Sequence, residues 1–526
     1  MSTQTQAPST SPGGSDLREG VPVRLFNSMT RQLEPFRPRH GNQARVYSCG
    51  PTVYNYAHVG NLRAYVFADT LRRTLQWKLL DVLHVINITD VGHLTSDADE
   101  GEDKVELAAR TAQRSAYEIT QEYTEAFFAD LGRLNIRPAA VYARATRHIQ
   151  EMIAFVEVLQ RRGLTYDLAD GLYFDTGQVP DYGRLGALDL EAQVAGARVA
   201  ADPDKRQAWD FCLWRRSPEG SSRLMEWDSP WGKGFPGWHL ECSVMSLKYL
   251  GGPFDIHTGG VDHRQLHHPN EVAQNQGYLG TADSGANYWL HSEFLVLRDE
   301  KMSKSSGNFW RLQSLLDRGV HPLVYRYFLL QAHYRSQVDF SLEAIGSARI
   351  GLERILKRIG HLLAEAGDEG EHLVRLSGEA GSTTGGALGY LRSRFEDGLG
   401  SHARQHLERF DEAVSEDLGT PKALAVLSAV LSDPDLGPVD ALRLVASFDL
   451  VLGLQLLSLR PRELVMRPVG VTLSDAEVDE LVAQRAQARA DRDFARADEV
   501  RGRLAEAGVA LEDGPAGTVW SWQLRD

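Results

Sequence analysis

The sequence lacks the features that mark membrane and secreted proteins. No apolar run approaches the roughly 18 residues that a helix needs to cross a bilayer, so we expect no membrane partner. Three cysteines, Cys49, Cys212 and Cys242, are too few for a disulfide framework in a chain of 526 residues. The first residues also lack the apolar core of a signal peptide. We therefore expect a cytoplasmic protein.

The chain has no excess of basic residues. Its net charge of −14 gives no general attraction to nucleic acid or to anionic membranes, so any RNA-binding surface must be a local basic patch. The length predicts about three or four domains. The sequence contains no signal for an oligomer, and we take a monomer as the default.

The stretch from Gly237 to Glu271 concentrates residues that can bind a metal. Cys242 lies 25 residues before His267, and Glu271 follows four residues later, which places His267 and Glu271 on one helix face. Cysteine, histidine and glutamate together suit zinc, but a fourth ligand is missing from the stretch. A buried cysteine beside a surface His–Glu hydrogen bond explains the same residues about equally well.

A strand–turn–helix pattern begins at Ala44. Residues 44–49 alternate like a strand, residues 50–61 form a turn with glycine and histidine, and residues 62–80 have helical periodicity. A second strand at 81–89 then predicts a right-handed βαβ unit in a parallel sheet. The helix N-terminus is a natural place for phosphate, although any βα unit can end in this way.

Two further segments have nucleotide-binding character. A strand at 254–257 leads to Gly259, Gly260 and Asp262, an arrangement that suits a ribose at the carboxyl edge of a parallel sheet. After a strand at 294–297, Lys301 and Lys304 stand among small hydroxyl and glycine residues, which favours a basic loop around phosphates. A solvated basic turn has the same composition.

Residues 105–134 have a long amphipathic helical pattern. The second half of the chain reads as helical, and we expect helices at 342–366, 387–416, 421–431 and 438–457 with a flexible connection at 367–386. In the last segment an arginine stripe follows one helix face. Its members are Arg485, Arg489, Arg492, Arg496 and Arg503. Contact with nucleic acid explains the stripe, and so does a solvated face neutralised by nearby aspartates.

Taken in order along the chain, these motifs resemble those of cysteinyl-tRNA synthetase, a class I aminoacyl-tRNA synthetase. The resemblance rests on His58-Val-Gly-Asn61, on Lys301-Met-Ser-Lys304, and on Cys49, Cys242, His267 and Glu271, and it extends from about Val21 to Trp520. The family's usual first motif is His-Ile-Gly-His. Asn61 departs from it, although its amide can still donate a hydrogen bond.

The resemblance implies a zinc ion whose ligands are Cys49, Cys242, His267 and Glu271, with His268 the less favoured histidine and Cys212 structural. Serine differs from cysteine only in an oxygen for a sulfur, and a pocket without metal separates such pairs by a few kcal/mol at best. Zinc accepts a thiolate as a soft ligand. The amino-acid contacts implied are Thr52, Thr89, Trp238 and His257.

The resemblance also implies how ATP is bound and cysteine activated, with Mg²⁺ as a further expected cofactor. The implied catalytic residues are His58, Asn61, Lys301 and Lys304. The implied ATP-binding residues are His58, Gly60, Gly259, Gly260, Asp262 and Lys304.

The expected function is an ATP-dependent cysteine–tRNA ligase that forms cysteinyl-adenylate and transfers cysteine to tRNA(Cys). Phe494, Asp498 and Asp513 match positions near the anticodon. Two alternatives remain: a synthetase-derived ligase that joins activated cysteine to a small amine, and a zinc-containing RNA-binding protein without catalysis. The helical region after Ser341 argues against the first, and Lys301 with Lys304 argues against the second.

The expected fold is α/β: a Rossmann-like parallel-sheet catalytic domain with a small insertion domain, followed by an all-α helical bundle and a small α+β C-terminal domain. The boundaries that we expect are a disordered tail at 1–20, the catalytic domain at 21–141 and 207–320 around an insertion at 142–206, a connective stem at 321–345, a helical bundle at 346–470 and the last domain at 471–526. The resemblance implies that the helical bundle binds tRNA and that the last domain recognises the anticodon.

Overall fold

A computed structural model describes residues 20–92, 94, 103–187, 204–218, 220, 223–297, 310–379, 385–514 and 517–523. The tail expected at 1–20 lies outside these residues except for Gly20. Among the described residues, no helix has both the length and the apolar character that crossing a membrane requires.

A five-stranded parallel sheet forms the centre of the molecule. Its strands, in spatial order, are β11 (Ala286–Ser292), β10 (Phe254–Gly260), β3 (Gln43–Ser48), β4 (Asp81–Ile88) and β5 (Val141–Arg144). Helix α1 (Val59–Trp77) connects β3 to β4, and these two strands pair in parallel from Gln43↔Asp81 to Ser48↔Ile86. The predicted βαβ unit and parallel sheet are confirmed.

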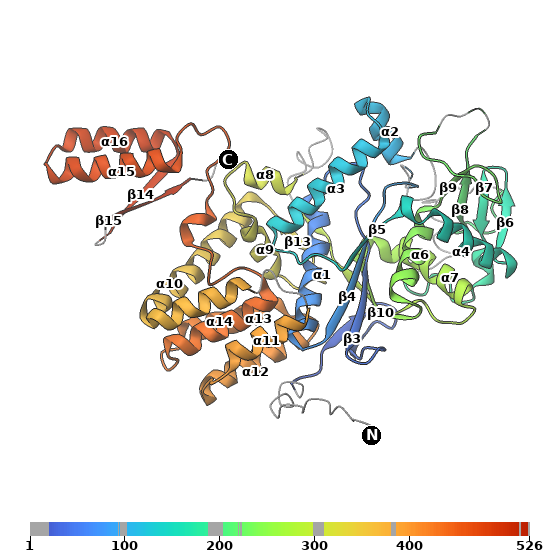
Figure 1. The fold of residues 1–526 in the computed structure, drawn as a ribbon, viewed down its shortest axis with the longest axis horizontal. Helices are drawn as coiled ribbons and strands as arrows, with labels where there is room; N and C mark the ends of the chain where they lie inside the picture. The colour runs from blue at the N-terminus through green and yellow to red at the C-terminus, as the bar shows by residue number, and fades with distance from the viewer. Residues whose placement is uncertain are drawn as a thin grey trace, which may run out of the picture.

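Helices cover both faces of this sheet, as a parallel sheet requires. Figure 1 shows α1 on one face and α6 (Trp238–Leu250) with α7 (His267–Leu279) on the other. Strand β4 illustrates the consequence, because its last five residues are all buried. A hairpin of β1 (Arg24–Asn27) and β2 (Gln32–Pro35) lies against β11.

A four-stranded antiparallel sheet is inserted between β5 and β10. It consists of β6 (Thr165–Leu168), β7 (Gly171–Phe174), β8 (Phe211–Arg216) and β9 (Gly234–Pro236), and α4 (Ile149–Arg161) precedes it. Two of its strands come after residue 206. The insertion expected at 142–206 therefore contains only half of this sheet.

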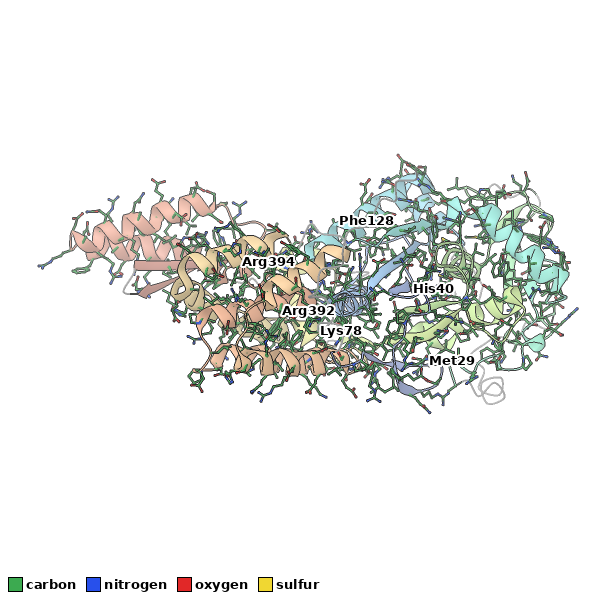
Figure 2. All side chains as sticks on the ribbon, turned by 60° about the horizontal axis from the view of Figure 1, so that its bottom comes forward. Met29, His40, Lys78, Phe128, Arg392 and Arg394 are labelled. Carbon is green, nitrogen blue, oxygen red and sulfur yellow. The ribbon has the colours of Figure 1, made fainter. Side chains whose placement is uncertain are left out.

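The helical region packs against the outer side of α1. Its helices are α9 (Pro322–Leu330), α10 (Leu342–Glu379), α11 (Gly385–Glu396), α12 (Ser401–Ser415), α13 (Thr420–Ser432) and α14 (Pro438–Leu452). At the end of α1, Lys78 donates to Asp411 Oδ2 at 2.7 Å, and the Arg392 guanidinium lies 3.6 Å from the centre of the Trp77 ring. Figure 2 labels Lys78 and Arg392 at this junction.

The chain ends in a small α+β unit beyond the bundle, at one end of the molecule in Figure 1. It contains α15 (Asp475–Ala490), α16 (Phe494–Glu506) and an antiparallel hairpin of β14 (Val509–Gly514) and β15 (Gly517–Trp522).

Short β12 (Leu295–Leu297) and β13 (Val338–Phe340) pair in parallel near α8 (Leu312–Leu316). The predicted fold class is confirmed in all of its parts.

Three helix predictions need correction. Residues 105–134 form two helices, α2 (Lys104–Ala112) and α3 (Ala116–Arg133), because Gln113 adopts a left-handed φ of 55° and Ser115 starts a new helix as its N-cap. Residues 387–416 are divided between α11 and α12. The connection expected from 367 is helical as far as Glu379, with a kink at Gly367.

Candidate active site and metal centre

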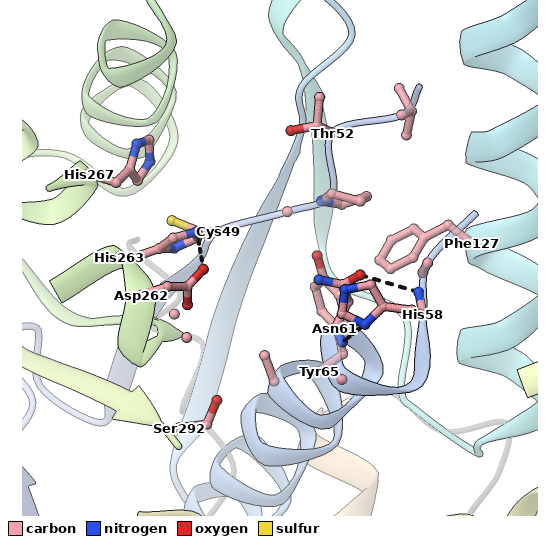
Figure 3. A pocket seen from close by; sticks show the side chains of 18 of the residues that line it. Cys49, Thr52, His58, Asn61, Tyr65, Phe127, Asp262, His263, His267 and Ser292 are labelled. Carbon is pink, nitrogen blue, oxygen red and sulfur yellow. Dashed lines mark hydrogen bonds and ion pairs between the residues drawn. The ribbon is translucent and has the colours of Figure 1, made fainter. Parts of the chain in front are cut away.

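A cavity of about 520 Å³ opens where β3 and β10 end and α1 begins. The two strands are neighbours in register, with Ser48 opposite Thr258, so the residues that follow them meet at one edge. The Cys49 amide donates to the Thr258 carbonyl at 3.1 Å. Figure 3 shows Cys49 and His267 on one side of the cavity and His58 with Asn61 on the other.

The N-terminus of α1 forms one side of the cavity. His58 is the N-cap of α1. Its Nδ1 accepts a hydrogen bond from the backbone N–H of Asn61 at 3.1 Å, and the side-chain Oδ1 of Asn61 accepts one from the backbone N–H of His58 at 3.2 Å. Burial lowers the pKa of His58, partly opposed by Asp262. Because Nδ1 is the acceptor, the neutral ring carries its proton on Nε2. Asn61 is thus a reciprocal cap of the helix.

Described residues on both sides of the loop that holds Lys301 and Lys304 lie beside this helix end. Leu295, in β12, lines the cavity. After the loop, the Trp310 carbonyl accepts a hydrogen bond from the Val59 amide at 2.8 Å, and Arg311 pairs with His58 in a β-bridge. Lys301 and Lys304 themselves lie outside the described residues.

Four candidate metal ligands converge on the other side. The donor atoms of Cys49, Cys242, His267 and Glu271 all lie within 4.8 Å of one another. His267 Nε2 is 3.4 Å from Cys242 Sγ and 3.2 Å from Glu271 Oε1. The end of β3, the helix α6 and the first turn of α7 supply them, so residues far apart in sequence form one N, O, S₂ donor set of the kind zinc accepts.

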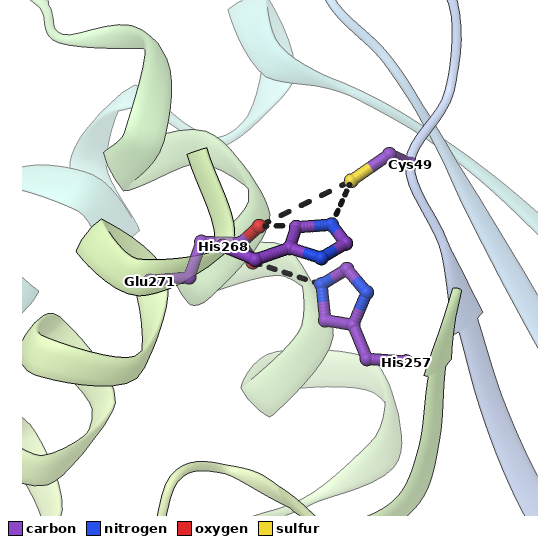
Figure 4. A group of neighbouring side chains, drawn as sticks. All are labelled: Cys49, His257, His268 and Glu271. Atoms are coloured by element: carbon purple, nitrogen blue, oxygen red, sulfur yellow. Dashed lines mark hydrogen bonds and ion pairs between the residues drawn. The ribbon is translucent and has the colours of Figure 1, made fainter. Parts of the chain in front are cut away.

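A second set shares two of these residues. Cys49, His257, His268 and Glu271 also place their donor atoms within 4.8 Å (Figure 4). His268 Nε2 is 3.3 Å from Cys49 Sγ, and His257 Nε2 is 2.9 Å from Glu271 Oε2. Cys49 and Glu271 therefore belong to both sets, one completed by Cys242 and His267 and the other by His257 and His268.

Further histidines orient this group. His239 Nδ1 lies 2.9 Å from His267 Nδ1, which directs His267 Nε2 toward Cys242 and Glu271. His268 Nδ1 lies 2.8 Å from His291 Nε2. Hydrogen bonds to the second ring nitrogen fix the tautomer and orientation of a metal-binding histidine, and both candidate histidines have one.

Burial governs the protonation of the thiols. It raises the pKa of Cys49 well above its ordinary value, with Cys242 adding to the effect, and it also raises the pKa of Cys242. Both thiols are therefore neutral in the metal-free protein at neutral pH. A metal that binds here must displace their protons.

The expected amino-acid contacts divide into two groups. Thr52 and Trp238 line the cavity, and the Trp238 indole stacks on His267 with ring centres 4.2 Å apart. Thr89 and His257 lie behind the lining: Thr89 Oγ1 donates to Glu241 Oε2 at 2.8 Å, and His257 contacts Glu271.

The expected ATP-binding residues Gly60, Gly259, Gly260 and Asp262 all line the cavity. A Cβ on Gly260 would lie 2.3 Å from Asp262 Oδ1, so a side chain there would displace the Asp262 carboxylate. Sequence reasoning missed Lys104 and His263, which also line the cavity. His263 could have been found, because it lies in the same histidine-rich stretch as His267.

The three residues expected near the anticodon lie in the C-terminal unit. Phe494 and Asp498 are exposed. The Asp513 carboxylate accepts hydrogen bonds from Arg485 at 2.8 Å and from Arg489 at 2.7 Å. Two arginines of the stripe are thus held by one aspartate.

Comparison with known proteins agrees with this geometry. The family described as the catalytic domain of class I (C) tRNA synthetases matches residues 35–350, and the cysteinyl-tRNA ligase anticodon binding domain matches residues 474–520. A LeuRS from Agrobacterium radiobacter K84, solved with tRNA and LeuAMS, shares the fold, with a TM-score of 0.53, 13% identity, and coverage of 91% of this chain and 95% of that one. The fold and the site define a class I aminoacyl-tRNA synthetase.

Relatives of known name specify the amino acid. The cysteine–tRNA ligase of Novosphingobium aromaticivorans is 51% identical over 96% of this chain and 97% of its own length. That of Zymomonas mobilis is 48% identical over 96% of this chain and 99% of its own length. The chain belongs to the cysteinyl-tRNA synthetase family, the ATP-dependent cysteine–tRNA ligases. The function expected from the motifs is confirmed, with cysteine, ATP and tRNA(Cys) as its substrates.

Proposed function

We propose that this ligase selects cysteine through a zinc ion held by Cys49, Cys242, His267 and Glu271. The supporting observation is the convergence of these four donor atoms within 4.8 Å, on one side of the cavity whose other side is the N-terminus of α1. Zinc, when bound, supplies a soft Lewis acid for the substrate thiolate. The stacked pair of Trp238 and His267 closes the pocket beside the sulfur.

The residues around α1 bind the phosphates of ATP. The helix N-terminus presents a positive dipole end, and His58 can donate from Nε2 because its Nδ1 already accepts. Lys301 and Lys304 add positive charge to the transferring phosphate, and Mg²⁺ accompanies ATP. Gly259 and Gly260 let the ribose approach the backbone, with Asp262 as acceptor. The carboxylate of cysteine then attacks the α-phosphorus, and pyrophosphate leaves.

The second step is transfer of cysteine from the adenylate to tRNA(Cys). Phe494, being exposed, can stack on an unpaired base, and Asp498 can accept from a base edge. Asp513 acts by holding Arg485 and Arg489 in place. The match of residues 474–520 to an anticodon binding domain supports this role over the joining of cysteine to a small amine.

Cysteine-dependent exchange of pyrophosphate into ATP, with serine as control, tests the first step. X-ray absorption at the zinc edge tests the metal: adding cysteine should introduce one more zinc–sulfur distance. Exchange without a change in the zinc spectrum would rule out the proposed contact while leaving the ligase activity in place.

A further inference from the structure

The helical bundle contains a second group of metal-binding side chains, remote from the cavity. His402 and His406 lie one turn apart on α12, and Asp433 is the residue that caps the C-terminus of α13. His402 Nε2 and His406 Nε2 each lie 2.8 Å from Asp433 Oδ2. The three donor atoms are within 4.8 Å of one another.

The cluster closes the open end of a helical hairpin. Helix α12 packs on α13, and the short connection between them spans 416–419. His402 lies in the first turn of α12, whereas Asp433 follows the last turn of α13, so the three residues join the two ends that the connection leaves apart. A bond among the three side chains therefore fixes the two helix ends that the 416–419 connection does not join.

The separations suit a single ion. Bonds of about 2.0–2.2 Å to nitrogen and carboxylate oxygen place tetrahedral neighbours roughly 3.3 Å apart. The present nitrogen–oxygen separations of 2.8 Å need to open by only a few tenths of an ångström. Rotation of the half-exposed His402 ring can supply that movement. The ring centres of His402 and His406 are 5.4 Å apart and nearly perpendicular.

The exposure of the three side chains lets an ion enter, and their donor atoms suit a transition ion. The His406 side chain is 4% exposed, whereas that of His402 is 47% exposed and that of Asp433 is 17% exposed. An ion can thus enter from the His402 side, with water completing its coordination there. Two imidazoles and a carboxylate without sulfur suit divalent zinc, cobalt or nickel.

We propose that His402, His406 and Asp433 form a second site for a divalent first-row transition ion such as Zn²⁺, which joins α12 to α13. The site is independent of the cavity: it has no thiol, and its three residues take no part in the proposed chemistry.

Zinc content of the full chain, after dialysis against micromolar free zinc, tests the proposal. The wild-type protein should bind two zinc ions, and His402→Ala should bind one, with unchanged cysteine-dependent exchange. His361→Ala is the matched control, because His361 is an exposed histidine in the same bundle. It should keep both ions. Since His402 is half exposed, its substitution removes little packing, and Asp433→Asn provides an independent variant with the same expectation.

The double variant Cys49→Ser, Cys242→Ser separates the two sites. It should keep one zinc ion, which addition of His402→Ala should remove. If His402→Ala and Asp433→Asn bind as much zinc as the wild type, the cluster is a hydrogen-bonded cap and the proposal is wrong. If wild type binds one ion and His402→Ala binds none, the bundle site stands and the proposed zinc centre in the cavity fails.

Discussion

The cavity cluster and the bundle cluster both combine histidine with a carboxylate, yet they are built in opposite ways. Cys49, Cys242, His267 and Glu271 come from a strand end and two helices, and all are buried. His402, His406 and Asp433 come from one hairpin, and only His406 among them is buried. Thiols belong to the first cluster alone, and there further histidines hold the ligands.

The two clusters therefore have different expected roles: the cavity cluster recognises a substrate, and the bundle cluster holds two helices together. A buried set with thiols must order several elements at once, and it presents a soft metal to a cavity where a substrate can bind. A set on one hairpin needs to order only two helix ends. Zinc in the first cluster should therefore determine activity, whereas zinc in the second should affect only the bundle.

The largest expected effect comes from Cys242→Ser. A serine hydroxyl stays protonated and binds zinc poorly, so the cavity cluster should lose its ion and cysteine activation should fall by more than about 100-fold, beyond the cost of losing an outer-shell partner. Pyrophosphate exchange and zinc analysis measure both. Cys212→Ser is the matched control, because Cys212 is also a buried cysteine outside any disulfide but packs on Tyr166 and Tyr173 in the inserted sheet.

The bundle cluster should keep its zinc in Cys242→Ser. A loss of both ions from a folded variant would contradict the independence of the two clusters. Unchanged zinc content would contradict the assignment of Cys242 as a ligand.

His239→Leu should have the next largest effect. The substitution removes the ring that contacts His267 Nδ1 at 2.9 Å, and loss of such a partner typically lowers metal affinity by about 10–100-fold. Competition with a chelator measures the affinity of the cavity cluster. His239→Gln should recover most of it, because its amide oxygen can accept from His267. Equal losses in the two variants would indicate a packing effect.

Asp513→Asn should affect tRNA and neither metal cluster. The Asp513 carboxylate accepts hydrogen bonds from Arg485 and Arg489, and the substitution removes the negative charge that pairs with both arginines. Aminoacylation at limiting tRNA(Cys) should fall severalfold, with pyrophosphate exchange unchanged. A parallel fall in exchange would show that the C-terminal unit influences the cavity.

Local patterns were sufficient for much of the fold. The helix expected at 62–80 is α1 at Val59–Trp77, because a histidine N-cap and an apolar period mark it clearly. The helix expected at 105–134 failed because its apolar period continues across the break at Gln113. The missed signal was the capping box of Ser115 and Glu118. Glycines at 367–386 suggested a connection, yet buried Leu373 and Leu376 keep α10 helical.

The site was only partly predictable from local pattern. Spacing places both His267 and His268 near Glu271, and their Nε2 atoms lie 3.2 Å and 3.9 Å from its Oε1, so periodicity cannot separate them. Cys49 has no local signal, because its position beside Cys242 depends on the packing of α6 against β3. The family resemblance supplied it. The bundle cluster was missed because Asp433 reaches α12 only through helix packing.

His84 provides the smallest expected effect and a reference for both clusters, since it is a buried histidine that belongs to neither set. Its Nε2 lies 2.8 Å from Ser48 Oγ, and burial, aided by Arg72, lowers its pKa to about 3. In the unfolded chain His84 takes up a proton near pH 6.5, whereas in the folded protein it stays neutral down to about pH 3. The free energy of unfolding therefore falls as the pH drops from 6.5 toward 3. At pH 5 the loss is about 2 kcal/mol. In His84→Gln, which cannot titrate, the fall in unfolding midpoint between pH 7.5 and pH 5 should be smaller by roughly 1–4 °C. Calorimetry at both values measures it, and an identical fall in the two proteins would show that other groups determine the acid sensitivity.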